Sequence, residues 1–366
     1  ESFDSRSFID AMERTGADAS RLEALFEQHG IRAVEARAAT ADDGVAADAV
    51  VAALNDFHAH SELLEAYIYA TTSTNSFDER AQALMAEYEM TSTRVRPLTA
   101  RFAAWVASLG VDSLAHVSPA VAEHREPLAK LAARSEHQMS EAEEGLYAAL
   151  LASGSSAWGQ LQHTVTSQLT TTVHMPDGTT PTLPMAAVRG LASNADAAVR
   201  KAAYDAEQAA WPQIATACAA AMNGVKGEAN VVNSRHGWSS PLDASLFANS
   251  VSRATFDAMH QAVTDSLTDF RRWMRSKAKL HGHDGALPWY DMFAPLPFAP
   301  AAISWDEGID IVRNAFHAYG GPLSGIVDRA LHEQWIDAGP RSGKVGGAFC
   351  MPFIDRKSTR LNSSHA

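Results

Sequence analysis

The feature that most constrains the fold is a long run of apolar residues at helical spacing in the first part of the chain. This spacing predicts an amphipathic helix over residues 46–70, whose apolar face must pack against other helices. A second helical run follows a polar break at residues 71–75 and extends from residue 77 to 88 and onward to Val106, so the two predict an antiparallel helical hairpin. The apolar positions of the first run are Val50, Val51, Leu54, Phe57, Leu64, Tyr67 and Ile68.

The rest of the chain predicts more helices and one β-hairpin. A capping box at Ser304 and Glu307 predicts the start of one helix, and Gly320 predicts its end. Residues 161–173 are rich in Thr and Val, and a turn at 175–178 returns the chain along 179–183, which predicts a hairpin. The fold class is therefore mainly α with a small β-hairpin. Helices are expected over residues 118–134, 140–152, 195–235 with a break at Pro212, 253–280 and 305–317.

Composition narrows the function classes. Hydrophobic residues make up 46% and charged residues 20% of the chain, which is typical of a soluble globular protein. The net charge is −13 and no basic run occurs, so no nucleic-acid partner is expected. No apolar run is long enough to span a membrane, and no signal-peptide pattern opens the chain, which also lacks an initiator Met. Cys218 and Cys350 are far apart, which favours a reducing, cytoplasmic compartment.

Metal and catalytic motifs are incomplete in this sequence. A zinc peptidase helix needs HExxH, but after His332 and Glu333 the second His position is Ile336. No two of the 15 histidines are three or four residues apart. The mixed pairs His58/Glu62 and His137/Glu141 favour surface hydrogen bonding, and a solvated linker explains residues 281–284 as well as a metal loop does. We therefore expect no catalytic and no metal-ligating residue in this chain.

Several segments, in the same order along the chain, resemble the oligoendopeptidase F family of zinc metallopeptidases, which are thimet-oligopeptidase-like. The most informative is residues 341–353, which is similar to a Gly-Lys-x-x-Gly-Ala-Phe segment that the family carries not far before its HExxH helix. Each motif alone is weak, but the resemblance extends over residues 45–354. The other segments are Trp335-Ile336-Asp337, residues 289–296, residues 235–240, and the group Arg200, Ala202, Tyr204 and Trp211.

The resemblance implies a multi-helix oligopeptidase architecture whose C-terminal catalytic part is incomplete here. It implies an N-terminal helical region at 1–115, helices plus the β-hairpin at 116–190, and the start of the peptidase catalytic domain at 191–354. Residues 355–366 are polar and aperiodic, and they resemble a translated sequencing adapter; a flexible natural tail is the alternative.

The resemblance also implies a function. In the intact protein, zinc held by HExxH and a downstream Glu would activate water to hydrolyse short peptides. Both ligand groups would lie beyond Phe353, so this chain by itself is expected to be an inactive N-terminal fragment. Residues 346–349 are predicted to form a short strand with an exposed edge, where Gly347, Ala348 and Phe349 would bind substrate by pairing with an extended peptide. The alternative is that the glycines only permit tight packing.

Two other classes of function stay open. A helical binding or scaffold protein without catalysis would explain the helix-rich pattern and the missing motifs. A different hydrolase using Cys350 or His332 has little support, because no partner residues can be named. If the chain is truncated, the helices over residues 253–332 should expose apolar faces that the missing part would cover.

Overall fold

The computed structural model describes residues 2–296, 303–347 and 349–351. It divides into two compact units. Unit 1 comprises residues 1–165, 214–262 and 348–366, and unit 2 comprises residues 166–213 and 263–347. Two of the four boundaries between the units fall inside helices, α8 (Ser155–Gln168) and α13 (Arg253–Leu280).

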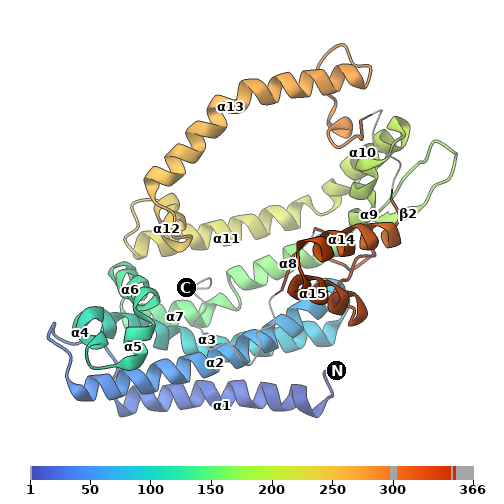
Figure 1. Ribbon diagram of the computed structural model, residues 1–366. Helices are drawn as coiled ribbons and strands as arrows, with labels where there is room; N and C mark the ends of the chain where they lie inside the picture. The colour runs from blue at the N-terminus through green and yellow to red at the C-terminus, as the bar shows by residue number, and fades with distance from the viewer. Residues whose placement is uncertain (1, 297–302, 348, 352–366) are drawn as a thin grey trace. The chain divides into compact units, whose positions relative to one another are not determined.

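The described residues form a mainly helical fold with one two-stranded sheet (Figure 1). No helix among them is long and apolar enough to cross a membrane. The remaining α-helices are α1 (Arg6–Gln28), α2 (Ala41–Thr74), α3 (Glu79–Leu109), α4 (Val111–Ala115), α5 (Pro119–Glu123), α6 (Arg125–Arg134), α7 (Glu141–Leu151), α9 (Met185–Gly190), α10 (Ala197–Ala210), α11 (Ala215–Arg235), α12 (Pro241–Ala248), α14 (Trp305–Tyr319) and α15 (Gly321–His332). The strands are β1 (Thr170–Thr172) and β2 (Thr182–Pro184), and the short 3-10 helices are η1 (Ser135–His137), η2 (Leu191–Ser193), η3 (Trp211–Gln213) and η4 (Trp289–Asp291).

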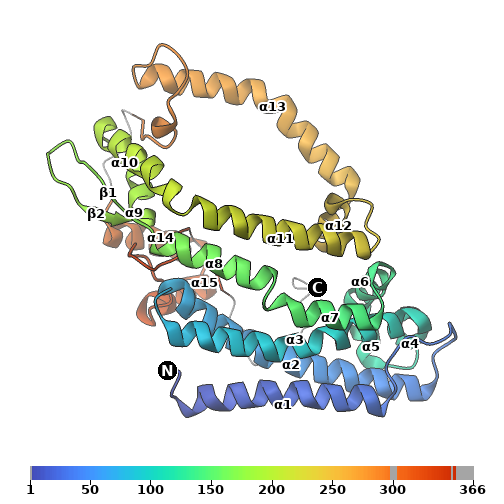
Figure 2. The same cartoon turned by 180° about the vertical axis from the view of Figure 1, so that it is seen from behind.

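Unit 1 is built on three long helices, α1, α2 and α3, which lie side by side (Figures 1 and 2). Their apolar faces meet in one core, in which Leu22, Phe26, Val50 and Phe102 are fully buried. Side-chain caps define the helix starts: Thr40 and Asp43 form a capping box at α2. Burial of such large side chains stabilises the hairpin by about 1.5–3 kcal/mol each.

Helix α11 belongs to unit 1 and is joined to α7 and α8 by polar and close contacts. The Glu228 carboxylate accepts hydrogen bonds from the backbone N–H of Ser155 at 2.7 Å and from its Oγ at 2.7 Å. Because Ser155 opens α8, this carboxylate sits where the helix dipole favours an anion. Gly224 lets α11 approach Trp158: a Cβ built there would lie 2.6 Å from the indole ring.

Unit 2 contains the β-hairpin, the short helices beside it, and the pair α14 and α15. Strands β1 and β2 are antiparallel, with Thr171 opposite Leu183. Helix α10 packs against α9, β1 and η4. Helices α14 and α15 pack on each other, and an ion pair from Arg313 Nε to Asp328 Oδ1 at 2.7 Å joins them.

Most of the predicted helices form. The secondary structure of two segments was predicted wrongly, and each error has a physical reason. The prediction of strand from Leu161 is wrong for its first half, because α8 continues to Gln168 and β1 starts only at Thr170. The β propensity of Thr and Val is weak enough for tertiary packing to override it. The helix predicted over residues 118–134 is divided at His124, whose backbone leaves the helical region. The capping box at Ser304 and the break at Pro212 are confirmed.

Candidate functional site

The predicted substrate segment does not form a strand in its described residues. Gly346 and Gly347 are bends, and the φ of Gly347 is +99°, outside the extended region. Phe349 is 54% exposed and makes an edge-on contact with the ring of Tyr69, with centroids 5.4 Å apart. Ala348 lies outside the described residues. The prediction of a strand is therefore wrong for Gly346, Gly347 and Phe349. The substrate-binding role of Gly347, Ala348 and Phe349 stays a prediction.

The loop before this segment is held by hydrogen bonds from charged side chains within unit 2. Both guanidinium NH groups of Arg341 donate to the Asp337 carboxylate at 2.8 Å. Lys344 Nζ donates to the carbonyl oxygens of Asp337 at 2.6 Å and of Gly339 at 3.2 Å. Hydrogen bonding from Arg341 holds the pKa of Asp337 below its usual value. Lys344 of the family-like segment is thus hydrogen-bonded within its own loop.

A buried charged cluster in unit 2 brings together two other family-like positions. Arg200 and Asp291 have side chains that are each 2% exposed, and Arg200 Nη2 lies 2.7 Å from Asp291 Oδ1. Arg200 Nη1 also donates to the carbonyl oxygens of Asn194 at 2.7 Å and Ala195 at 2.9 Å. His283 Nε2 lies 2.6 Å from Asp291 Oδ2. Burial opposes ionisation of Asp291, but hydrogen bonds from His283 and Arg200 outweigh it and lower the pKa of the carboxyl.

Two further cationic or titratable groups border this cluster. Lys277 Nζ donates to the carbonyl oxygen of Met292 at 2.7 Å and lies 5.4 Å from the centre of the Trp273 ring. Burial, followed by repulsion from Arg200, lowers the pKa of Lys277. Burial likewise lowers the pKa of His281, whose Nε2 is buried without a hydrogen-bond partner in the described part. The cluster therefore fixes the α10, α13 and η4 segments against one another by charge.

Residues 281–284 were considered from sequence as a metal loop; of these, His283 Nε2 lies 2.6 Å from Asp291 Oδ2. Within the described ranges, no group of three or more His, Cys, Asp or Glu side chains could hold a metal ion.

The residues 235–240 that resemble the family form a second polar junction, within unit 1. The ring of His137 stacks on that of Trp238, with centroids 3.5 Å apart. His137 Nδ1 lies 3.1 Å from the carbonyl oxygen of His236, and His236 Nε2 lies 2.8 Å from Glu144. Of the His137/Glu141 pair considered from sequence, His137 thus contacts the residues that follow α11.

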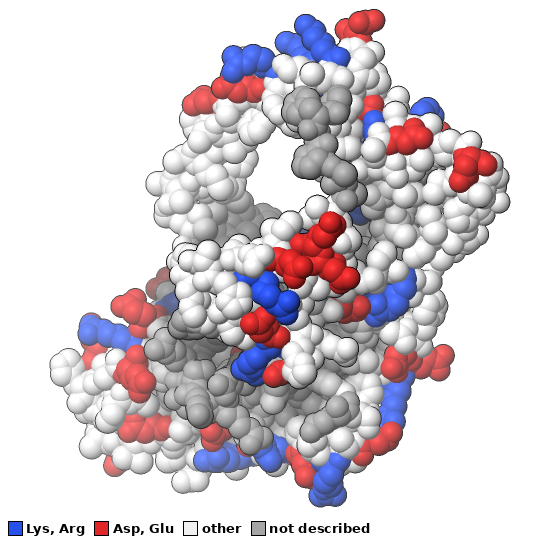
Figure 3. Space-filling view, turned by 45° about the vertical axis from the view of Figure 1, so that its right-hand side comes forward, with Lys and Arg blue, Asp and Glu red and all other residues white. Residues whose placement is uncertain are grey.

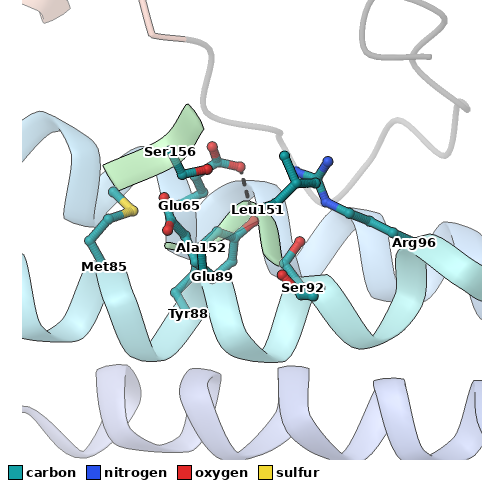
Figure 4. Close-up of a pocket in the computed structure, with 10 residues that line it drawn as sticks. Glu65, Met85, Tyr88, Glu89, Ser92, Arg96, Leu151, Ala152 and Ser156 are labelled. Atoms are coloured by element: carbon teal, nitrogen blue, oxygen red, sulfur yellow. Dashed lines mark hydrogen bonds between the residues drawn. The ribbon is translucent and has the colours of Figure 1, made fainter. Parts of the chain in front are cut away.

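A polar pocket in unit 1 was not predicted from the sequence (Figure 4). At its floor, the buried Tyr88 hydroxyl hydrogen-bonds to Glu65 at 2.9 Å and Ser61 at 2.8 Å. Burial raises the pKa of Glu89, which Arg96 partly offsets. The lining residues on α3 are spaced as on one face of a helix. This spacing is the feature of the sequence from which the pocket could have been found. The lining residues are Glu65, Met85, Tyr88, Glu89, Ser92, Thr93, Arg96, Leu151, Ala152 and Ser156.

Comparison with known proteins identifies the fold. Residues 111–170 match the family model described as Oligopeptidase F, a stretch that ends before the segments on which the resemblance was based. No curated protein sequence matches the chain.

Solved structures with this fold are longer than the chain. The oligoendopeptidase-F from Enterococcus faecium has a TM-score of 0.67 at 17% identity, over 88% of this chain and 66% of its own. A putative oligoendopeptidase F from Bacillus anthracis str. Ames has a TM-score of 0.63 at 13% identity, over 93% of this chain and 59% of its own. PZ peptidase A, crystallised with an inhibitor, has a TM-score of 0.66 at 11% identity, over 92% of this chain and 56% of its own.

Proposed function

We propose that this chain is the N-terminal part of a zinc-dependent oligoendopeptidase. The fold likeness and the family-model match together support the oligoendopeptidase F family. The whole protein would hydrolyse short peptides in the cytoplasm. The observation that carries the proposal is the fold likeness over 88% of this chain. Two cysteines without a disulfide, Cys218 and Cys350, fit a reducing compartment.

The zinc belongs, in this proposal, to a part of the protein that this sequence does not contain. The described residues do not fit a zinc ion, because no suitable ligand group is found among them, and the full sequence has no HExxH. The chain also spans only 56% to 66% of the solved structures that it matches. We therefore propose that the 366-residue chain does not cleave peptides on its own.

The substrate-side role of Gly347, Ala348 and Phe349 rests on backbone access. Gly346 and Gly347 have no side chains, so a peptide could approach their backbone closely. In an active longer protein, Ala348→Pro would remove one backbone N–H and should raise KM. Ala348→Ser keeps that N–H and is the control; equal KM values for both variants would contradict the role.

The experiment compares this chain with the longer product of the same gene. Each is assayed with a short quenched fluorescent peptide, before and after a zinc chelator and after zinc is restored. We expect no cleavage by the chain and chelator-sensitive cleavage by the longer product, recovered with zinc. A folded longer product without cleavage would contradict the proposal and favour a helical binding or scaffold protein.

A further inference from the structure

The polar pocket of unit 1 has opposite charges at the two ends of its lining on α3. Glu89 and Arg96 lie about two turns, or roughly 10 Å, apart along the helix axis. Side chains on one helix pair directly at the shorter spacing of about one turn. Opposite charges lie next to each other at several places on the face shown in Figure 3. In the part of the chain that the structure describes, Glu89 and Arg96 make no ion pair with any residue.

Two carboxylates share the acidic end of this pocket. The Glu65 carboxylate accepts a hydrogen bond from the Tyr88 hydroxyl at 2.9 Å. Burial raises the pKa of Glu89, Arg96 opposes this shift, and repulsion from Glu65 adds to it. A cationic group bound between the two carboxylates would offset both the burial and the repulsion. The acidic end is therefore suited to a positively charged ligand group.

Hydroxyl groups and one backbone oxygen complete the lining between the two charges. Ser92 and Thr93 lie between Glu89 and Arg96 on α3, and Ser156 adds a third hydroxyl from α8. Pro97, inside α3, has no N–H to donate, so the carbonyl oxygen of Thr93 lacks its usual helical hydrogen bond. All these oxygens can accept hydrogen bonds from an ammonium group. In Figure 4 the Arg96 side chain extends from its own turn of α3 toward Leu151.

The size of the pocket limits what it can hold. Its volume is about 120 Å³, and a cavity of about 150 Å³ accepts benzene in another protein. The ligand therefore has about six non-hydrogen atoms inside the pocket. We propose that this pocket binds a small zwitterion of the α-amino acid class, with its ammonium at Glu65 and Glu89 and its carboxylate at Arg96. L-Alanine has this size and carries both charges.

Ligands with a single charge fit this lining less well. A simple cation leaves the Arg96 guanidinium without a partner, although a guanidinium binds a carboxylate through two parallel hydrogen bonds. A simple anion at Arg96 leaves the burial and repulsion at Glu89 unrelieved. The pocket lies wholly within unit 1, so the proposal depends on no contact between the units. It goes beyond the proposed function, because it involves no peptide cleavage.

Methionine-methyl NMR of the 366-residue chain tests the site. Met85 lines the pocket, so its methyl resonance reports occupancy, and the other methionines report the fold. L-Alanine is added up to about 10 mM, which fills roughly nine-tenths of a site whose Kd is about 1 mM. We expect the Met85 resonance to shift and to saturate. Propionate lacks the ammonium and L-alaninamide lacks the carboxylate, so each should bind at least about tenfold more weakly.

Variants that remove one charge each locate the ligand. Glu89→Gln and Arg96→Gln should each raise the Kd for L-alanine by at least about tenfold. Glu87→Gln makes the same change as Glu89→Gln at an exposed position of α3 outside the pocket, and it should change the Kd by less than about twofold. Because neither Glu89 nor Arg96 is ion-paired in the described structure, both variants should keep the fold and the resonances of distant methionines.

Three results would overturn the proposal. A folded chain whose Met85 resonance shows no saturable shift with L-alanine would mean that the pocket holds only water. Equal Kd values for the wild type, Glu89→Gln and Arg96→Gln would place the ligand outside the pocket. Binding of propionate or L-alaninamide as tight as that of L-alanine would show that one charge is enough, so the ligand would not be a zwitterion.

Discussion

Replacing Asp291 by Asn should destabilise unit 2 strongly, because the change leaves a buried positive charge without its counter-ion. Asp291 and Arg200 are each 2% exposed and 2.7 Å apart. Removing one partner of such a buried pair costs about 3–5 kcal/mol. The stability of a whole domain is about 5–15 kcal/mol, so the change removes a large part of it. Helix α10, which carries Arg200, should therefore open locally.

An exposed ion pair on the same helix provides the matched control. Lys201 and Asp205 of α10 are 54% and 58% exposed and 2.6 Å apart. Exposed pairs contribute about 0–1 kcal/mol. Asp205→Asn makes the same chemical change as Asp291→Asn, so any difference between the variants reports burial of the charge.

Hydrogen exchange measured by mass spectrometry resolves the effect by segment. A loss of 3 kcal/mol or more corresponds to roughly a hundredfold faster exchange in α10. We expect that increase for Asp291→Asn, less than about fivefold for Asp205→Asn, and no change in α3. Equal exchange in α10 for the two variants would refute the reasoning.

Acid titration gives a second test of the same cluster. The pKa of Asp291 is depressed in the folded protein, as burial is outweighed by bonds from His283 and Arg200. A group with a depressed pKa contributes stability above its unfolded pKa, about 3.9, and loses it as the pH falls through the folded value. Exchange in α10 should therefore accelerate below about pH 4 in the wild type, and this step should be absent in Asp291→Asn. A step of equal size in the variant would assign it to other carboxyl groups.

Two further predictions concern α11 in unit 1. Gly224→Ala places a Cβ 2.6 Å from Trp158 and should cost about 1–3 kcal/mol in urea unfolding; Gly227→Ala meets nothing within 4 Å and should leave stability unchanged or raise it by up to about 1 kcal/mol. Glu228→Gln removes the anion at the start of α8, where Ser155 donates two hydrogen bonds, and should lower the urea midpoint by an amount equivalent to about 0.5–2 kcal/mol. An unchanged midpoint would mean that α8 is capped by other groups.

Local patterns carried most of the fold prediction. The helix over residues 46–70 lies inside α2, and α13 has the predicted bounds. The capping box at Ser304 and Glu307 was readable because its hydrogen bonds join residues three apart. Helix α1 was not assigned from periodicity, although it lies in the N-terminal helical region that the resemblance implied. The strand assigned from Leu161 was mostly helix, because short Thr-rich segments do not separate the two structures by periodicity.

The candidate sites depend on contacts that local patterns cannot supply. Arg200 and Asp291 were both noted as family-like, but they are 91 residues apart and their pairing follows from the packing of η4 on α10. The polar face of α3 could be seen in the sequence. The sequence did not show which other helices would line a pocket at Tyr88. Gly347 was expected in a strand, but its φ is +99°. Glycine adopts such a positive φ readily, and only the tertiary structure shows which glycine does so.

The two units differ in the kind of side chains that they bury. Unit 1 buries Phe26 and Phe102 fully, whereas α14 of unit 2 has no buried residue in the described part, and α13 buries only Lys277 and Ala278. A buried ion pair is by itself a weak source of net stability. Unit 2 should therefore be less stable than unit 1, and hydrogen exchange should be faster in α10 than in α3; slower exchange in α10 would contradict this ranking.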